Sequence, residues 1–198
     1  IGEPGRVLFQ NSGAETIEAS IKLVRRFHGL GRHGIVSAER SFHGRTFAAL
    51  AATGQPEKHQ PFKPLPEGFR LAVWNDLESF SAAIDPSIGA ILVEPLQGEG
   101  GVNPADRGFL EGLRSLCDEH GLLLVIDEVQ TGLGRTGEWF CHHHYGIQAD
   151  IVTVAKALGN GVPIGAVWAK PEIADAFKPG DHGSTFAGQP LAASAARE

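Results

Sequence analysis

Three polar residues lie where apolar, strand-like segments end. They are Glu94 after residues 90–93, Asp127 after residues 122–126 and Lys156 after residues 151–155. Ligands of open α/β sheets bind beyond the carboxyl ends of the strands. We therefore expect the three side chains to meet at one site.

Lys156 and Asp127 offer complementary chemistry. A lysine amine that loses its charge on burial is the nucleophile of Schiff-base chemistry. A carboxylate at the end of an apolar strand is costly unless it is paired, so Asp127 could anchor a cationic ligand group. Two alternatives stay open: Lys156 could extend its amine to the sheet edge, and Asp127 could cap a helix or pair with Arg135. The glycine-containing segment 159–161 favours a site, because it lets a ligand approach the backbone closely.

A phosphate site is predicted at the start of the first long helical pattern. Ser12 and Glu15 match the S-x-x-E capping box. The free N–H groups of Gly13 and Ala14, together with the helix dipole, would form a seat for an anion. The capping role and the phosphate role are compatible.

Two other segments carry weaker signals. Phe42 could belong to the core or stack on a planar ring, and Arg45 could bind a substrate carboxylate with both arms of its guanidinium. Residues 141–144 read Cys-His-His-His, but adjacent positions on a helix point in different directions and cannot all ligate one ion. We predict a surface or interface cluster there and no metal site.

A nucleotide-binding oxidoreductase is a remote alternative. Residues 29–34 and 132–137 both fit G-x-G-x-x-G, which must follow a strand and open a helix to bind a dinucleotide. The first copy follows a helical pattern. The second is separated from its strand by residues 129–131, and Asp150 comes too early to serve as the acidic partner.

Strand-like and helix-like segments alternate along the chain, which predicts an α/β fold with a mostly parallel sheet flanked by helices. Residues 122–126 lack polar alternation, as expected of a strand buried on both faces. The expected strands are 7–9, 35–36, 71–74, 90–93, 122–126, 151–155 and 164–169. The expected helices are 15–28, 45–52, 76–84 and 106–120, and residues 54–69 are expected to form the longest loop.

Composition excludes several classes of protein. The chain has 198 residues, of which 42% are hydrophobic and 20% charged, a globular profile. A net charge of -6 without a basic run argues against a nucleic-acid partner, and no apolar stretch approaches the roughly 20 residues that a membrane helix needs. Two cysteines outside any C-x-x-C favour a reduced, cytoplasmic setting. The absence of methionine leads us to expect an internal fragment of a longer protein.

Six motifs in order resemble the class III aminotransferases, which have fold type I and use pyridoxal phosphate. They are residues 11–15 (NSGAE), 41–46 (SFHGRT), 94–101 (EPLQGEGG), 127–132 (DEVQTG), 155–159 (AKALG) and 183–186 (GSTF). The resemblance extends over essentially the whole chain. It implies that residues 1–198 form a single cofactor-binding large domain, without the N-terminal segment and the C-terminal small domain of the family.

The resemblance also implies roles for individual residues. Lys156 would hold the cofactor through its amine and then carry the proton between substrate and cofactor, while Asp127 would pair with the pyridine nitrogen. Thr185 would complete the phosphate site of a neighbouring subunit, which implies a homodimer. The other implied cofactor contacts are Ser12, Gly13, Ala14, Phe42, Val129 and Gln130, and the implied substrate contacts are Arg45, Glu99 and Ser184.

Within the class, the chain most resembles the enzymes that act on N-acetylornithine. The implied reaction is transfer of its terminal amino group to 2-oxoglutarate, a step of arginine biosynthesis. Ornithine, succinylornithine and 4-aminobutyrate are alternative amino donors, because the cofactor residues are shared across the class. An inactive fragment is a further alternative.

Overall fold

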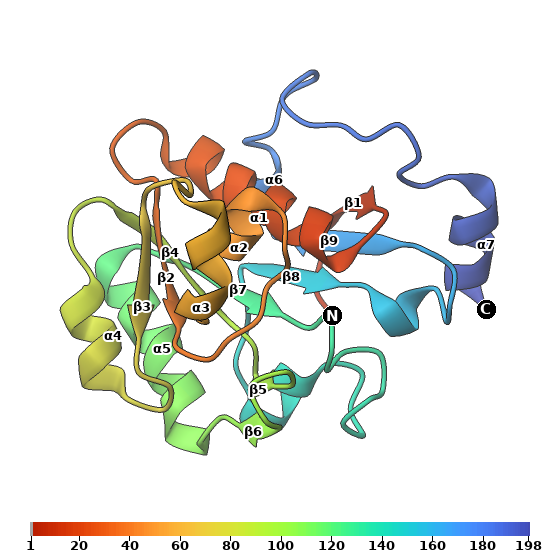
Figure 1. Cartoon of the computed structure of the whole chain (residues 1–198). Helices are drawn as coiled ribbons and strands as arrows, with labels where there is room; N and C mark the ends of the chain where they lie inside the picture. The colour runs from red at the N-terminus through yellow and green to blue at the C-terminus, as the bar shows by residue number, and fades with distance from the viewer. Residues whose placement is uncertain (1) are drawn as a thin grey trace.

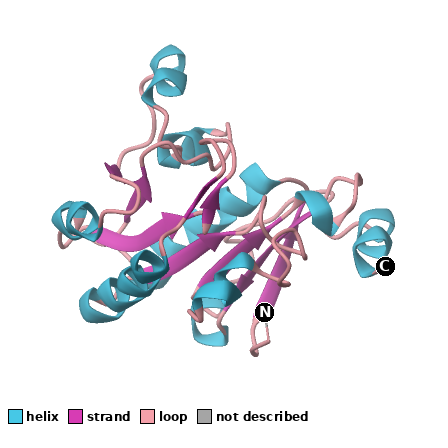
Figure 2. Cartoon of the chain, turned by 90° about the horizontal axis from the view of Figure 1, so that it is seen from below, coloured by secondary structure: helices cyan, strands magenta, loops and turns pink. Residues whose placement is uncertain are grey.

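The computed structural model describes residues 2–198, which build one seven-stranded sheet, a two-stranded sheet and the helices around them (Figures 1 and 2). The strands are β1 (Arg6–Gln10), β2 (Gly34–Ala38), β3 (Phe69–Ala72), β4 (Ile88–Val93), β5 (Leu96–Gln97), β6 (Asn103–Pro104), β7 (Leu123–Asp127), β8 (Ile151–Val154) and β9 (Gly165–Ala169). The α-helices are α1 (Gly13–His28), α2 (Phe47–Ala52), α3 (Pro56–His59), α4 (Leu77–Ala83), α5 (Arg107–His120), α6 (Pro171–Ala174) and α7 (Pro190–Arg197). The 3-10 helices are η1 (Gln60–Phe62), η2 (Cys141–Tyr145) and η3 (Lys156–Leu158).

The large sheet is mostly parallel, as the sequence predicts. Its strand order is β1-β9-β8-β7-β4-β2-β3. The five strands from β8 to β3 pair in parallel, whereas β9 pairs antiparallel with both β8 and β1. Six of the seven strands therefore run in one direction, and their carboxyl ends share one edge of the sheet.

Each face of the sheet is covered by its own helices (Figure 2). Helices α1, α2 and α6 contribute to one core, in which Ile17 and Val24 pack with Val125 and Ile151. Helices α4 and α5 contribute to the opposite core. Successive residues of a strand point to opposite faces, so a strand buried on both sides is apolar throughout, as β7 is.

The ends of the principal helices follow from local sequence. Ser12 caps α1 and accepts a hydrogen bond from the Glu15 N–H at 3.3 Å, so the predicted cap is present. The Glu15 carboxylate accepts from the N–H of Asn11 at 2.7 Å, one residue earlier than in the usual capping box. Gly121 ends α5 in the left-handed conformation that glycine adopts readily.

Two expectations about local structure need correction. Strand β3 covers Phe69–Ala72 instead of 71–74, because it pairs with β2 in a register that matches Ala38 to Ala72. The segment 54–69 is not one loop, since it contains α3 and η1. Pro56 opens α3 with its φ angle already suited to a helix, so the proline that suggested a loop begins a helix instead.

The order in which the chain adds strands to the sheet reverses between β2 and β4. From β2 the chain moves outward to β3 and then returns to β4 on the other side, from which it continues to β7 and β8. Connections after β2 and β4 therefore diverge, and a crevice forms between them at the carboxyl edge. In the described part of the chain, no helix is both long and apolar enough to cross a membrane.

Candidate active site

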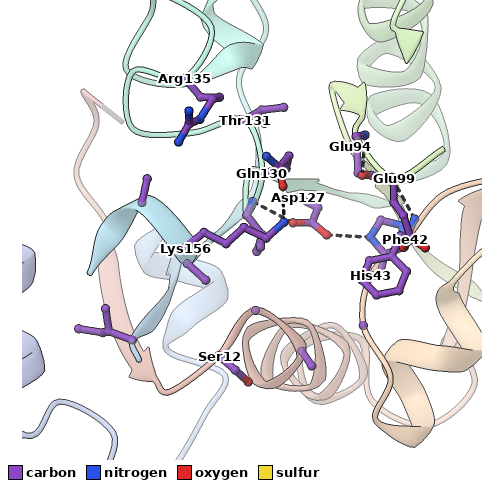
Figure 3. A pocket seen from close by; sticks show the side chains of 18 of the residues that line it. Ser12, Phe42, His43, Glu94, Glu99, Asp127, Gln130, Thr131, Arg135 and Lys156 are labelled. Atoms are coloured by element: carbon purple, nitrogen blue, oxygen red, sulfur yellow. Dashed lines mark hydrogen bonds and ion pairs between the residues drawn. The ribbon is translucent and has the colours of Figure 1, made fainter. Parts of the chain in front are cut away.

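A pocket of about 1330 Å³ opens at the carboxyl edge of the sheet. The segments that follow β1, β2, β4, β7 and β8 all contribute to its wall, and Figure 3 shows their side chains gathered around it. Ten of the twelve site residues expected from sequence line this pocket. They are Ser12, Gly13, Ala14, Phe42, Arg45, Glu99, Asp127, Val129, Gln130 and Lys156.

Asp127 ends β7 and is buried at the base of the pocket. Its Oδ1 accepts hydrogen bonds from the Val129 N–H at 3.0 Å and the Thr153 hydroxyl at 3.1 Å. Its Oδ2 lies 2.8 Å from Nδ1 of His43, whose side chain is fully buried. These partners replace the helix cap and the Arg135 ion pair that the sequence left open, and they fix the orientation of the carboxylate.

Lys156 follows β8 and opens η3 with a backbone φ of 44°, in the left-handed region that lysine rarely adopts. Its amine donates a hydrogen bond to Oε1 of Gln130, from the connection after β7 (Figure 3). Strands β7 and β8 are neighbours, so the two chemical groups predicted from separate strand ends face the same pocket. An unusual backbone conformation at such a residue is typical of a functional site.

The start of α1 forms one wall of the pocket. Gly13 and Ala14 occupy its first two positions, where backbone N–H groups have no acceptor within the helix. A Cβ atom added at Gly13 would lie 2.8 Å from Cγ1 of Val129, so only glycine leaves Val129 in place. The helix start thus presents N–H donors and positive dipole to the pocket, with Val129 packed beside them.

Glu94 is the third strand-end residue and is also buried. Its carboxylate accepts from the N–H of Phe42 at 3.1 Å and from the N–H of Gly98 at 3.4 Å, which links the connections after β2 and β4. Burial raises the pKa of Glu94 to about 7, and the Asp127 carboxylate adds to the rise. His43 and the two N–H donors act in the opposite direction.

Ser184 and Thr185 are exposed and do not line the pocket of their own chain in the described structure, and Ser184 accepts a hydrogen bond from Asn11, which does line it. One sequence expectation nearby needs correction. The cluster at 141–144 is not wholly on the surface. Cys141 and His142 are buried, and Nδ1 of His142 lies 2.8 Å from the Glu128 carboxylate.

No sequence pattern points to His43. Its partner Asp127 lies 84 positions away, so no local pattern marks the pair. The available signal was its place after β2, beyond the carboxyl end of another parallel strand. Across residues 2–198, no group of three His, Cys, Asp or Glu side chains is arranged to hold a metal ion.

The G-x-G-x-x-G segments lack the context of a dinucleotide site. Residues 132–137 lie in turns that lead to η2, and no helix begins there. Residues 29–34 connect α1 to β2, which is the reverse of the required order.

The pocket has the parts that pyridoxal phosphate requires. A lysine amine and a buried, hydrogen-bonded carboxylate face one cavity, whose wall carries the N-terminus of a 16-residue helix. Because Gly13 has no side chain, Val129 can pack directly beside it, and the backbone of this helix start stays accessible. An amine for the aldehyde, a carboxylate for the ring nitrogen and N–H donors for the phosphate are therefore all present.

Comparison with known proteins points to one family. Residues 1–198 match the family described as Aminotransferase class-III. Acetylornithine aminotransferase of Corynebacterium efficiens is 52% identical over 200 residues, which cover 100% of this chain and 49% of the relative. Succinylornithine transaminase of Salmonella paratyphi B is 53% identical over 195 residues, covering 96% and 48%. The chain thus spans about half the length of the curated relatives it matches.

Solved structures agree with the fold. The ornithine aminotransferase of Toxoplasma gondii superimposes with a TM-score of 0.93 at 37% identity, over 97% of this chain and 48% of that one. Another structure of that enzyme is described with partial occupancy of pyridoxal phosphate at its active site.

Proposed function

The chain belongs to the class III aminotransferases, and from this premise we propose that it provides the active site of a pyridoxal-phosphate-dependent transaminase. The proposed reaction transfers the terminal amino group of N-acetylornithine to 2-oxoglutarate. One observation carries the proposal. The amine of Lys156 and the carboxylate of Asp127, which follow adjacent parallel strands, face a single pocket that also holds the start of α1.

Asp127 is suited to hold a proton on the pyridine nitrogen. When bound, pyridoxal phosphate supplies an electron sink for negative charge that develops on the substrate. An ionised carboxylate opposite the ring nitrogen favours the protonated ring, which attracts electrons more strongly. The hydrogen bonds from His43, Thr153 and Val129 keep the carboxylate in one orientation for this task.

Lys156 is suited to two tasks that use the same atom. Its Nζ would hold the cofactor through the aldehyde, and the same amine, when free, would move a proton at the substrate carbon. Gln130 accepts a hydrogen bond from this amine and orients it within the pocket. Phe42 and Val129 are proposed to cover the two faces of the ring, and Ser12, Gly13 and Ala14 to hold the phosphate.

The substrate assignment rests on the relatives. Three relatives that are 50–52% identical are named acetylornithine aminotransferase, while a relative at 53% is named succinylornithine transaminase. Both names describe an ornithine that carries an acyl group, so acylated ornithine is the donor class we propose. Arg45 and Glu99 line the pocket and Ser184 lies next to it, where they are proposed to contact the substrate.

The cofactor site can be tested by chemical trapping. After incubation with pyridoxal phosphate, the full chain is reduced with borohydride and digested, and the labelled peptide is sequenced. We expect label on Lys156 alone, loss of label in Lys156→Ala, and unchanged labelling in the control Lys63→Ala, since Lys63 is exposed outside the pocket. Label on a different lysine, or none, would contradict the proposal.

The donor is tested by turnover with 2-oxoglutarate. N-acetylornithine, succinylornithine, ornithine and 4-aminobutyrate are compared as donors at equal concentration. We expect the two acylated donors to be used best, with N-acetylornithine first. A preference for free ornithine would contradict the substrate assignment and leave the cofactor assignment intact.

A cytoplasmic homodimer is the proposed state of the protein. Thr185 is exposed and outside the pocket of its own chain, which is consistent with a contact to the phosphate site of a second copy. Both cysteines are buried free thiols, consistent with a reducing compartment. We expect sedimentation to give twice the chain mass, and Thr185→Ala to weaken cofactor retention. A monomer with full cofactor affinity would contradict this proposal.

A further inference from the structure

The segment that carries Ser184 and Thr185 makes few contacts of its own. Residues 183–186 belong to the connection between α6 and α7 (Figure 1), and all four are exposed. Within the described structure, their one side-chain hydrogen bond is the one that Asn11 donates to the Ser184 hydroxyl at 2.8 Å. Ordering a backbone costs about 1–2 kcal/mol per residue in conformational entropy. The position of this segment therefore depends on how the residues next to it are held.

The turn that precedes this segment is bound to α1. The Asp181 N–H donates to the Lys178 carbonyl at 3.0 Å, and the Asp181 carboxylate accepts from the Lys178 N–H at 2.8 Å, which closes the turn. The same carboxylate oxygen accepts from Nε of Arg26, on α1, at 2.9 Å. Residues 178–181 are thus attached to the helix whose first turn forms a wall of the pocket.

His182 makes a second contact with α1, directly before the exposed segment begins. Its half-buried ring stacks on Phe177, with the centroids 5.9 Å apart and the planes at 11°. Nδ1 of His182 lies 3.1 Å from Nζ of Lys22, which also donates to the Asp181 carbonyl at 2.7 Å. The ring is therefore held between Phe177 and Lys22, and it fixes the direction in which the chain enters residues 183–186.

The contact between Lys22 and His182 requires a neutral imidazole. A lysine ammonium donates hydrogen bonds and cannot accept them, so the contact forms with the tautomer of His182 that has its hydrogen on Nε2 and its lone pair on Nδ1. A second proton on the ring would bind at Nδ1 and place an N–H group against the ammonium. The hydrogen bond would then be lost, and two positive charges would repel each other at this distance.

The other charged groups around His182 do not replace this contact. Glu15 and Glu18 of α1 favour the protonated ring, but their carboxylates accept hydrogen bonds from other segments. The Asp181 carboxylate is taken up by its ion pair with α1. Burial and the charge of Lys22 lower the pKa of His182 from its ordinary value of 6.5, so the neutral ring prevails at neutral pH.

We propose that His182 is a positioning residue for cofactor retention: by accepting a hydrogen bond from Lys22, it holds residues 183–186 where Thr185 can reach the phosphate site of a second copy. This inference rests on the proposed transaminase function and on the proposed dimer. Protonation of His182 frees the segment, so the phosphate is held less tightly at low pH. Helix α1 then supports the phosphate site twice, through the N–H groups at its start and through Lys22 farther along.

The test compares pyridoxal phosphate with pyridoxal, which has the same ring and aldehyde but no phosphate. The dissociation constants of both are measured on the full chain at pH 8 and pH 5, in wild type and in His182→Asn. Between these pH values, we expect the constant for pyridoxal phosphate to increase about fivefold more in wild type than in His182→Asn, in line with one partly exposed hydrogen bond to a charged group. The constant for pyridoxal should change equally in both chains. Since both chains meet the same form of the ligand at each pH, the comparison removes the titration of the ligand itself.

A set of variants separates the acceptor of His182 from its charge. The side-chain oxygen of asparagine can take the place of Nδ1 and does not titrate, so His182→Asn should bind pyridoxal phosphate as tightly as wild type at pH 8. Glutamine extends to the place of Nε2, so His182→Gln should bind about fivefold more weakly at pH 8. Lys22→Met removes the donor and should weaken binding by a similar factor. His33→Asn, at an exposed position directly before β2, is the control and should behave as wild type.

Nuclear magnetic resonance of the histidine ring nitrogens gives a readout that needs no cofactor. The signals of His182 are identified by their absence in His182→Asn. At pH 8 the ring should carry its hydrogen on Nε2. Its pKa should rise in Lys22→Met, because a neighbouring positive charge is removed. The wild-type loss of affinity for pyridoxal phosphate should have its midpoint at the pKa of His182.

The outcomes separate the two proposals. Equal pH dependence in wild type and His182→Asn, a hydrogen on Nδ1 at pH 8, or a pKa of His182 that stays the same in Lys22→Met would overturn the role of His182. A wild-type chain that binds no pyridoxal phosphate at pH 8 would instead overturn the proposed function. Circular dichroism verifies that each variant is folded. Should the His182 variants fail to fold, Lys22→Met decides the question: affinity for pyridoxal phosphate equal to that of wild type at pH 8 would overturn the proposal.

Discussion

Nδ1 of His43 lies 2.8 Å from Oδ2 of Asp127, and both side chains are buried at the carboxyl edge of the sheet. In the tautomer that carries its hydrogen on Nδ1, His43 donates a hydrogen bond to this carboxylate oxygen. Thr153 and the Val129 N–H occupy the other oxygen. The proposed anchor for a cationic ring nitrogen is thus held by donors from the segment after β2, from β8 and from its own connection after β7.

Replacing His43 with leucine should destabilise the fold and weaken cofactor binding. The variant removes one donor from a buried carboxylate, a loss of about 2 kcal/mol for a hydrogen bond to a charged group. Urea unfolding measures the stability, and titration with pyridoxal phosphate measures its affinity. The matched control is His33→Leu. His33 precedes β2, at the end of the strand opposite to His43, and its imidazole is exposed. Equal losses in both variants would contradict a specific role for His43.

Glu94 should make the stability of the protein depend on pH near neutrality. Its pKa is about 7 in the folded chain against an ordinary value of 4.5. Because the pKa of Glu94 is raised in the folded chain, its contribution to the free energy of unfolding is fully present below pH 4.5 and is lost as the pH rises through 7. The rise corresponds to about 3 kcal/mol across that interval.

Glu94→Gln isolates this contribution. Glutamine keeps the shape of the protonated side chain but does not titrate, so its unfolding free energy should lack the decline between pH 4.5 and 7.5. The quantity compared is the difference between wild type and variant in urea at each pH. Glu111→Gln, exposed on α5, provides the background. A difference that stays constant with pH would show that Glu94 does not titrate in this range.

Gly13 and Gly108 allow a matched test of the helix start. Both lie in the first turn of a long helix, but a Cβ at Gly13 would lie 2.8 Å from Val129, whereas one at Gly108 would have no atom within 4 Å. Gly13→Ala should cost about 1–3 kcal/mol by overpacking and lower cofactor affinity. Gly108→Ala should stabilise by about 0.5–1 kcal/mol. Thermal melts and cofactor titration of both variants test this, and a stabilised Gly13→Ala would contradict the close packing.

Much of the site was predictable because it depends on strand ends. Apolar runs followed at once by Glu94, Asp127 or Lys156 marked the carboxyl edge, and Ser12 with Glu15 marked a helix start. Their convergence in one pocket follows from parallel pairing, which the alternation of strands and helices already predicted. The family resemblance, not periodicity, supplied the cofactor and the individual roles.

The unpredicted features depend on contacts between distant segments. His43 reaches Asp127, and Lys58 reaches Glu99, across 84 and 41 positions. Strand β9 is antiparallel because of how it pairs with β1 and β8. The apolar residues of one strand do not indicate the direction in which that strand pairs. Helix α3 was missed because a proline suits the first turn of a helix as well as a loop.

The thiols of Cys117 and Cys141 should resist modification in the folded protein. Burial raises the pKa of Cys117 to about 12 and that of Cys141 to about 11, so little thiolate forms at neutral pH. Reaction with Ellman's reagent should therefore be slow in buffer and release two equivalents in urea. Cys141→Ala should leave one equivalent in urea. Fast reaction of either thiol in the folded protein would contradict this expectation.

The backbone of Lys156 should store strain that glycine relieves. At a φ of 44°, a residue with a Cβ costs about 1–2 kcal/mol relative to glycine. Lys156→Gly should therefore be more stable than Lys156→Ala by about 1 kcal/mol in urea unfolding without cofactor, although both variants lose the amine. At Lys22, within α1, the order should reverse, because glycine destabilises a helix interior by about 1 kcal/mol relative to alanine. If the glycine variant were less stable than the alanine variant at both positions, the left-handed conformation of Lys156 would not be a source of strain. If the order reverses as expected, the fold holds its reactive amine in place at a measurable cost in stability.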